Sequence, residues 1–178
     1  MKFSKFSTND IKEIRQLFIK TFSDSEGESE GVAIGNLTYE LMRNTDPKDV
    51  LGFIATEDNQ IIGCIFFTRM TFQNNVNAFL LSPVAIHTDF QRKGIGQKLI
   101  NYGIDHLKER QVSLVITYGD PAFYSKVGFQ QITVKTVKPP FNLSQPEGWL
   151  GLSLTAEEIQ PIPGKSSCVK AFEKPELW

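Results

Sequence analysis

Residues 82–96 read SPVAIHTDFQRKGIG, and this stretch decides which fold the sequence predicts. It begins inside a predicted strand, residues 78–86, and ends at the start of a predicted helix, residues 94–110. The first N–H groups of a helix have no partner within the helix and carry a partial positive charge, so they bind anions. Gly94 and Gly96 leave that turn open to a phosphate group, and Arg92 and Lys93 add positive charge nearby.

A Gly-x-Gly pair alone is also typical of a surface loop that only turns sharply. Two other phosphate-binding motifs do not fit this chain. The dinucleotide fingerprint requires a third glycine, and Leu99 occupies its position. Residues 164–166, GKS, resemble the end of a P-loop, but Ile159 stands where the leading glycine belongs. The residues therefore predict a phosphate-binding turn without naming its ligand.

Hydrophobic spacing and turn residues predict the elements on either side of this stretch. A first helix begins after Ser7 or Thr8 and carries apolar residues through Phe22, and a flexible acidic loop at 23–31 separates it from a second helix. The sequence predicts strands at 1–6, 50–56, 61–72, 78–86, 112–118, 149–154 and 168–172, and helices at 32–42, 94–110 and 121–127. This order predicts a mixed α/β (α+β) domain with one central, mostly antiparallel sheet flanked by about four helices.

Composition narrows the class of protein. The 178 residues suit a single domain, and a formal net charge of -1 gives no reason to expect a nucleic-acid partner. The first six residues lack the apolar core of a signal peptide, and no apolar stretch reaches membrane-spanning length. Cys64 and Cys168 are single and far apart, His87 and His106 stand alone, and no zinc-ligand spacing occurs. We expect a cytoplasmic protein with no metal site and no membrane contact.

Two blocks of sequence carry a family resemblance. Gln91-x-x-Gly94-x-Gly96, after the strand residues 81–86, resembles the acyl-CoA signature of the GNAT superfamily of N-acetyltransferases. Residues 124–129, YSKVGF, look like the Tyr-x-x-x-Gly-Phe that follows the fifth strand in that family. The resemblance covers residues 1–129 and is diffuse beyond them. It implies a GNAT-like acyl-CoA N-acyltransferase fold, with residues 1–178 as one domain and 139–178 as a divergent C-terminal part that completes the sheet.

The resemblance implies acetyl-CoA, the acyl form of coenzyme A, as co-substrate. Backbone groups around Val84 and Ile86 would hold the pantetheine arm as an added strand, and amides from Arg92 to Gln97 would hold the pyrophosphate. Pro83 cannot donate a ladder hydrogen bond, so we expect this strand to leave its neighbour there. The cofactor-binding residues that follow are Val84, Ala85, Ile86, Gln91, Arg92, Lys93, Gly94, Ile95, Gly96, Gln97 and Phe123.

The implied reaction is direct attack by a primary amine of a small molecule or peptide on the thioester, with Tyr124 as general acid. Packing is the alternative role of Tyr124, and a non-catalytic acyl-CoA-binding or regulatory module is the alternative function. Asp120 is a catalytic candidate, although the pair Asp120-Pro121 is also typical of a helix N-cap and first turn. Many family members carry an Asn before the tyrosine, whereas residues 117–123, TYGDPAF, contain none and resemble a poorly characterised subgroup.

Other candidate bases are His87, Asp89, Glu26, Glu28 and Glu40, and a water chain is an alternative to all of them. The acidic residues of 23–31 would attract a cationic amine, or form a solvated loop. Residues 139–148 with Trp149 would wall one side of the acceptor pocket. The acceptor itself stays open, as does homodimer formation.

Overall fold

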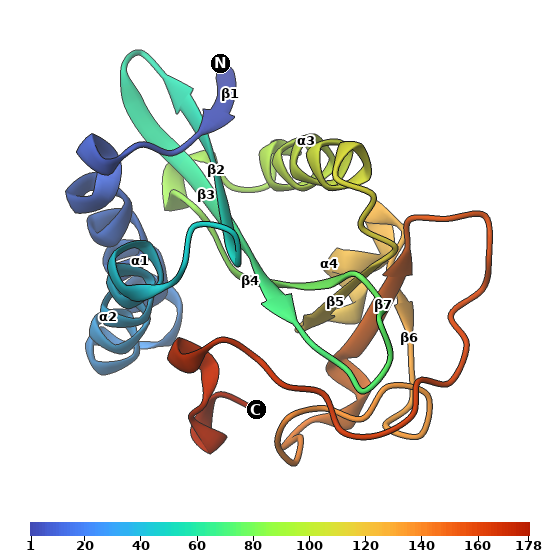
Figure 1. The fold of residues 1–178 in the computed structure, drawn as a ribbon. Coiled ribbons are helices and arrows are strands. Elements are labelled where there is room, and N and C mark those ends of the chain that lie inside the picture. The colour runs from blue at the N-terminus through green and yellow to red at the C-terminus, as the bar shows by residue number, and fades with distance from the viewer. The chain divides into compact units, whose positions relative to one another are not determined.

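The computed structural model describes all of residues 1–178, and Figure 1 labels its helices and strands. Seven strands follow the sheet order β1-β2-β3-β4-β5-β7-β6. They are β1 Lys2–Lys5, β2 Val50–Glu57, β3 Gln60–Met70, β4 Ala78–Ile86, β5 Leu114–Tyr118, β6 Gln130–Gln131 and β7 Trp149–Ser153. The four α-helices are α1 Ile11–Glu26, α2 Glu28–Asn44, α3 Ile95–Glu109 and α4 Pro121–Tyr124. The predicted mixed α/β fold with a mostly antiparallel sheet is confirmed.

The residues group into two compact units. The first comprises Met1–Phe66 and Pro83–Gly103, and the second comprises Phe67–Ser82 and Ile104–Trp178. Each unit is therefore made from two separate stretches of chain. That residues 1–178 act as a single domain stays a prediction.

In the first unit, α1 and α2 form a hairpin with a single connecting residue, Gly27, whose φ is 101°. The predicted flexible loop at 23–31 is wrong, because α1 continues to Glu26 and α2 begins at Glu28. Close packing explains the difference. A Cβ on Gly31 would lie 2.5 Å from the Ile19 carbonyl oxygen, so only glycine lets the two helices approach this closely.

The hairpin of β2 and β3 turns on Asp58 and Asn59, with φ values of 50° and 63°. Positive φ at both central residues is typical of the two-residue turn that matches strand twist, and Asp and Asn tolerate it. Residues 61–68 of β3 are all buried, as expected for a strand covered on both faces. Cys64, which is 0% exposed, is core as predicted.

In the second unit, β5 pairs with strands on both sides. Its register with β4 is parallel, from Ala78 opposite Leu114 to Leu81 opposite Thr117. Its register with β7 is antiparallel, from Leu114 opposite Ser153 to Tyr118 opposite Trp149. The short strand β6 pairs with the other side of β7 and forms the edge. The carboxyl end of β5 is thus held firmly on its β7 side.

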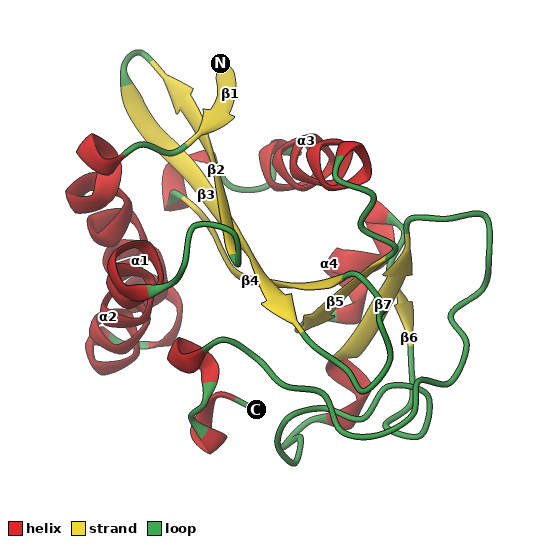
Figure 2. Cartoon of the chain, viewed as in Figure 1, coloured by secondary structure: helices red, strands yellow, loops and turns green.

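After β7 the chain runs as loop to two 3-10 helices, Lys170–Phe172 and Pro175–Leu177 (Figure 2). The predicted strand at 168–172 is wrong, since Val169 is extended and the turn of helix follows at once. This segment is anchored by Trp178, which is 5% exposed and whose indole N–H donates to the Phe172 carbonyl at 3.0 Å. The Trp178 ring also contacts Tyr118, Phe141, Trp149 and Phe172.

Replacing Trp178 with Ala should lower the free energy of unfolding by about 3–5 kcal/mol, because it empties a buried aromatic cluster. Trp178→Phe keeps part of the ring contacts, loses the indole hydrogen bond and leaves a smaller cavity, so we expect a smaller loss of about 1–2 kcal/mol. Urea unfolding followed by far-UV circular dichroism measures both. An Ala variant as stable as the parent would mean that the terminal segment does not contribute to the core.

Candidate functional site

The pairing of β4 with β5 stops before either strand ends. Leu81 opposite Thr117 is the last pair, although Ser82 and Tyr118 are both strand residues. The Thr117 hydroxyl donates to the Leu81 carbonyl at 2.8 Å, and the Gly119 N–H donates to the Gly148 carbonyl at 2.9 Å. A side chain therefore satisfies the last carbonyl of the ladder while β5 turns towards β7. The predicted divergence of the two strands just before Pro83 is observed in this register.

Beyond the divergence, β4 ends in the first unit with Pro83 to Ile86. Val84 and Ile86 are partly exposed, whereas Ala85 is 1% exposed. The His87 N–H donates to the Ile62 carbonyl of β3 at 2.8 Å. Because backbone groups of successive strand residues point to opposite edges, those of Val84 and Ile86 point away from β3. That edge of β4 can pair with an extended ligand.

Gln91, the first residue of the Gln-x-x-Gly-x-Gly motif, bonds to its own chain. Its side-chain Nε2 donates to the Ile86 carbonyl at 2.9 Å. The bond closes the loop that follows β4 and uses a carbonyl expected to face the pantetheine arm. Gln91 thus shapes the loop, and Val84 is left as the residue whose backbone is free for the arm.

The backbone between Gln91 and α3 is left-handed at two positions, Arg92 with φ 60° and Gly94 with φ 75°. The first intrahelical bond of α3 runs from the Lys98 N–H to the Gly94 carbonyl at 3.1 Å. The N–H groups of Ile95, Gly96 and Gln97 therefore precede it and have no acceptor one turn back. Left-handed turns ahead of such amides form a concave nest for anions. The backbone here has the geometry that the expected anion-binding turn requires, and anion binding itself stays a prediction.

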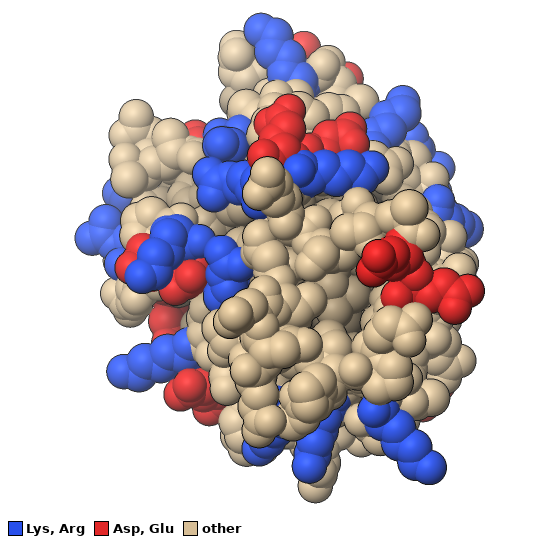
Figure 3. All heavy atoms as spheres, turned by 45° about the vertical axis from the view of Figure 1, so that its right-hand side comes forward, with Lys and Arg blue, Asp and Glu red and all other residues tan.

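The two basic side chains of this turn have different surroundings. Lys93 Nζ donates to the Asp89 carbonyl at 3.0 Å and lies 5.1 Å from the centre of the Phe90 ring, so it folds back on its own loop. Arg92 is exposed. On the face drawn in Figure 3, Lys and Arg side chains lie beside Asp and Glu, and neither sign covers a large area. The positive field at the turn is local, supplied by amides and one or two side chains.

His87, a candidate base, makes its described contacts within its own loop. Its Nδ1 accepts from the Asp89 N–H at 3.3 Å, and its ring contacts the Phe90 ring edge-on. Asp89 is largely exposed, with 81% of its side chain accessible. The geometry favours a structural role for His87.

Helix α1 is tied to the same loop by a contact that the sequence did not suggest. The Thr88 hydroxyl donates to Asp24 Oδ2 at 2.6 Å, and Lys20 Nζ lies 2.9 Å from the same oxygen. Hydrogen bonds from Lys20 and then Thr88 lower the pKa of Asp24. Among the acidic residues, Glu26 and Glu28 flank Gly27 and are exposed, and Glu40 lies on α2. None of these carboxylates is singled out as a base.

In the second unit, Tyr124 ends helix α4. Burial raises the pKa of its phenol above the ordinary value of 10.0, and a hydrogen bond with Thr117 acts in the opposite direction. The phenol therefore keeps its proton at neutral pH. A Cβ on Gly119 would lie 2.7 Å from Tyr124 Cε2, so the ring packs directly over this glycine. The sequence did not single out Thr117 and Gly119. The only available signal for them was their position shortly before the motif that begins at Tyr124.

Asp120 and Phe123 belong to the same turn. Asp120 Oδ1 accepts from the Ala122 N–H at 2.9 Å, with Pro121 in the first turn of α4. The N-cap alternative is confirmed, and the catalytic role stays a prediction. The Phe123 ring contacts the Tyr124 ring edge-on at 5.0 Å between centroids and is partly exposed.

Replacing Asp120 with Asn distinguishes a helix-cap role from a catalytic role. The amide oxygen still caps the helix but cannot take a proton, so we expect unchanged stability and a turnover within about twofold of the parent. Asp120→Ala loses the cap and should cost about 1 kcal/mol of stability. Thermal unfolding and the rate of thiol release measure the two effects. A hundredfold slower Asn variant with unchanged stability would restore Asp120 as the base.

Neither cysteine is an activated nucleophile. Burial raises the pKa of the Cys64 thiol well above its usual value, and burial raises that of Cys168 to about 11. No three His, Cys, Asp or Glu side chains lie grouped as metal ligands. None of the helices combines the length and apolar character that crossing a membrane requires.

Comparison with known proteins agrees with this geometry. Residues 48–131 match a family model described as an acetyltransferase (GNAT) domain. The chain is 27% identical over 171 residues to the uncharacterized N-acetyltransferase YjhQ of Escherichia coli K12, covering 93% of this chain and 90% of that protein. It is 34% identical over 82 residues to the uncharacterized N-acetyltransferase YhbS of the same strain, covering 45% of this chain and 49% of that protein.

Two solved structures share the fold. The YhbS protein of Escherichia coli, crystallised in complex with CoA, superposes with a TM-score of 0.82 at 22% identity, covering 97% of this chain and 92% of that one. A GNAT family acetyltransferase of Brucella melitensis in complex with acetyl-CoA gives 0.75 at 23% identity, covering 97% of both chains. Residues 48–131 are thus similar to the acetyltransferase (GNAT) domain, and the chain as a whole shares the fold of these two structures.

Proposed function

We propose that the chain is an acetyl-CoA-dependent N-acetyltransferase that acts on a primary amine of a small molecule or peptide. The observation that carries the proposal is the turn from Gln91 to Gly96, where left-handed residues at 92 and 94 precede the free amides of α3. A pyrophosphate fits such a nest because its oxygens accept several N–H bonds at once. The CoA and acetyl-CoA complexes of the two similar structures support the same ligand.

For the rest of coenzyme A, the proposed contacts come from the end of β4 and from Phe123 of α4. The backbone of Val84 points to the edge of β4 that has no β3 partner, as an extended pantetheine arm requires. Gln91 holds the loop closed through the Ile86 carbonyl. Ala85 faces the core and supports the strand from behind. Of the proposed contacts, those of Ile95, Gly96 and Gln97 use backbone alone, and Phe123 offers a partly exposed ring.

In the proposed reaction the amine nitrogen forms a bond to the thioester carbonyl carbon, and the carbon–sulfur bond breaks. An alkyl amine has a pKa of about 10.4, so it must first give up a proton to a base or to water. The departing thiol has a pKa of about 8.5 and accepts a proton as it leaves. Tyr124 donates that proton from its phenol and regains it from solvent. Burial keeps this phenol protonated at neutral pH.

Two measurements test this function. Calorimetric titration with acetyl-CoA should give saturable binding, and no binding up to about 1 mM would end the proposal. Thiol release from acetyl-CoA across a panel of primary amines should then identify acceptors. Binding without any release would favour the alternative, a non-catalytic acyl-CoA-binding module.

A further inference from the structure

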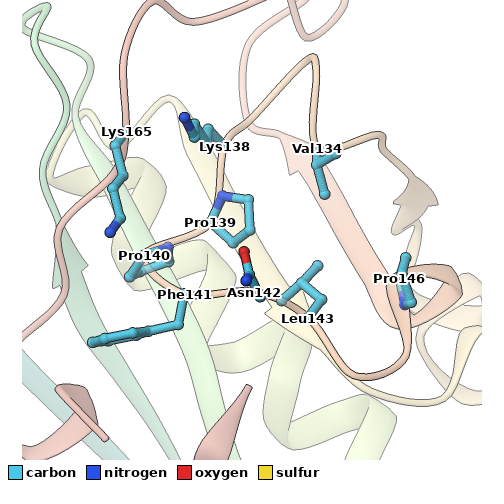
Figure 4. Close-up of a pocket in the computed structure, with 9 residues that line it drawn as sticks. All are labelled: Val134, Lys138, Pro139, Pro140, Phe141, Asn142, Leu143, Pro146 and Lys165. Carbon is cyan, nitrogen blue, oxygen red and sulfur yellow. The ribbon is translucent and has the colours of Figure 1, made fainter. Parts of the chain in front are cut away.

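A pocket of about 830 Å³ opens in the second unit, within the size range of small-molecule sites. Its lining comes from residues 134–146 and from Lys165 (Figure 4). The lining residues are Val134, Lys138, Pro139, Pro140, Phe141, Asn142, Leu143, Pro146 and Lys165. Two lysines and no carboxylate are among them. The pocket is therefore cationic by composition.

The charged and the apolar lining residues lie at opposite ends of the pocket. In Figure 4, Lys165 and Lys138 lie at one end with Phe141, and Val134 and Pro146 lie at the other. The exposed fraction of Val134 is 45%, high for an aliphatic side chain. An apolar surface left open at one end and charge at the other suits a ligand that is itself amphipathic.

Pro139 and Pro140 make part of the wall rigid. Both are buried, and their rings fix the backbone φ. A pre-formed wall spares a ligand the entropy of ordering a loop. The Asn142 side chain, which is exposed in this wall, offers one more acceptor and two donors to a polar group.

The two lysines are held opposite one another. Lys138 and Lys165 form an isolated parallel bridge, and the Lys138 carbonyl accepts from both the N–H and the hydroxyl of Ser166, at 3.2 and 2.6 Å. Like charges on directly paired residues repel. Lys165 Nζ lies 5.5 Å from the centre of the Phe141 ring, and neither ammonium forms an ion pair with the chain. An anion between them would turn this repulsion into attraction.

The wall of the pocket is hydrogen-bonded to the end of β5. The Gln145 N–H donates to the Tyr118 hydroxyl at 2.7 Å, and the Ser144 hydroxyl lies 3.0 Å from the same oxygen. Tyr118 is the last residue of β5, one residue before Gly119, over which the Tyr124 ring packs. One wall of the pocket is thus fixed to the end of the strand from which the proposed acid follows.

We propose that this pocket binds the carboxylate of the acceptor, so that the preferred acceptor is an amine with a carboxylate on an apolar body. The inference rests on the proposed function, because it names the acceptor class of that reaction. The carboxylate lies between Lys138 and Lys165, and the apolar body lies against Leu143 and Val134. The Phe141 ring borders the charged end, where it contacts the Lys165 ammonium.

Binding of a non-reactive probe tests the pocket without any catalysis. Calorimetry should detect 3-phenylpropionate, and its neutral amide should bind at least tenfold more weakly. Lys138→Met and Lys165→Met keep the apolar stems and should each weaken the carboxylate about tenfold while leaving the amide unchanged. Lys12→Met, an exposed lysine on α1, is the matched control and should change nothing. Equal binding of acid and amide, or lysine variants without effect, would overturn the pocket assignment.

Turnover tests the assignment to the acceptor. With acetyl-CoA, phenylalanine should have a KM at least tenfold below that of phenylalaninamide. Lys165→Met should raise the first KM about tenfold, with the second KM and both kcat values unchanged. If the probe binds in the pocket but the lysine substitutions leave KM unchanged, the pocket does not hold the acceptor. Failure of every amine to release thiol would instead remove the proposed function, while the probe titration still decides whether a carboxylate pocket exists.

Discussion

We expect Gly94→Asp to weaken acetyl-CoA binding by about a hundredfold and Gly94→Asn by only a few-fold. Gly94 has a φ of 75°, and a Cβ there would meet nothing within 4 Å. Space is therefore not the constraint at this position. What a side chain costs is the left-handed backbone, about 1–2 kcal/mol for most residues and less for Asn or Asp. Asn and Asp have nearly the same shape, so the pair isolates charge.

The carboxylate introduced by Gly94→Asp acts directly on the ligand. A carboxylate about 5 Å from a phosphate, at an effective dielectric of about 20, adds about 3 kcal/mol of repulsion, on the order of a hundredfold in Kd. It would also interact with the positive end of α3 and reduce the field that the anion uses. Calorimetric Kd values at two salt concentrations measure the effect, which should shrink as salt rises.

Two results would contradict this account. Equal losses for Asn and Asp would mean that backbone shape, and not charge, governs binding at this turn. No loss for either would mean that the anion lies elsewhere. Thermal unfolding of both variants without ligand controls for a damaged fold, and the two should agree within about 1 kcal/mol.

The elements that the sequence predicts best are those with a local cause. Strand β4 was predicted with its observed bounds, because its apolar run ends at a loop of charged and glycine residues. The β2–β3 hairpin also has a local cause, because Asp58 and Asn59 tolerate the positive φ that its turn requires. The acidic stretch 23–31 was misread because its composition is typical of loop, whereas its helices are stabilised by contact. Gly31, which looks like a helix breaker, is the residue that lets α2 pack on the Ile19 carbonyl.

The candidate site also has parts with a local cause and parts that depend on the fold. The anion-binding turn follows from local sequence, since Gly94 allows a positive φ and the next amides begin a helix. The bond from Gln91 to Ile86 and the one from Thr88 to Asp24 join residues through the fold, and no spacing predicts them. Asp120 shows that the type of a residue is not enough to assign its role. A carboxylate four residues before Tyr124 suggests catalysis, yet its observed hydrogen bond is that of a helix cap.

Tyr124→Phe should lower kcat by about a hundredfold or more while leaving the Kd for acetyl-CoA within about twofold. The ring that packs over Gly119 is kept, so only the hydroxyl and its hydrogen bond with Thr117 are lost. Loss of one hydrogen bond costs about 1 kcal/mol of stability, which thermal unfolding will detect. Tyr118→Phe makes the same chemical change in the same unit, and its hydroxyl bonds only to the pocket wall. It should leave kcat at saturating acceptor unchanged, and its effect should be confined to the acceptor KM.

The dependence of the reaction rate on pH gives a second test of Tyr124 as the acid. Burial raises the pKa of Tyr124 above 10.0, so the phenol carries its proton below that value and loses it only as pH rises through the higher one. The parent enzyme should therefore show no loss of the acid between pH 6 and about 9.5, and its rise in rate over this range should report deprotonation of the amine, whose pKa is about 10.4. The Phe variant should keep the same rise at a lower rate, because water must protonate the thiolate. Identical rates for parent and variant would remove Tyr124 from the reaction and leave it as a packing residue.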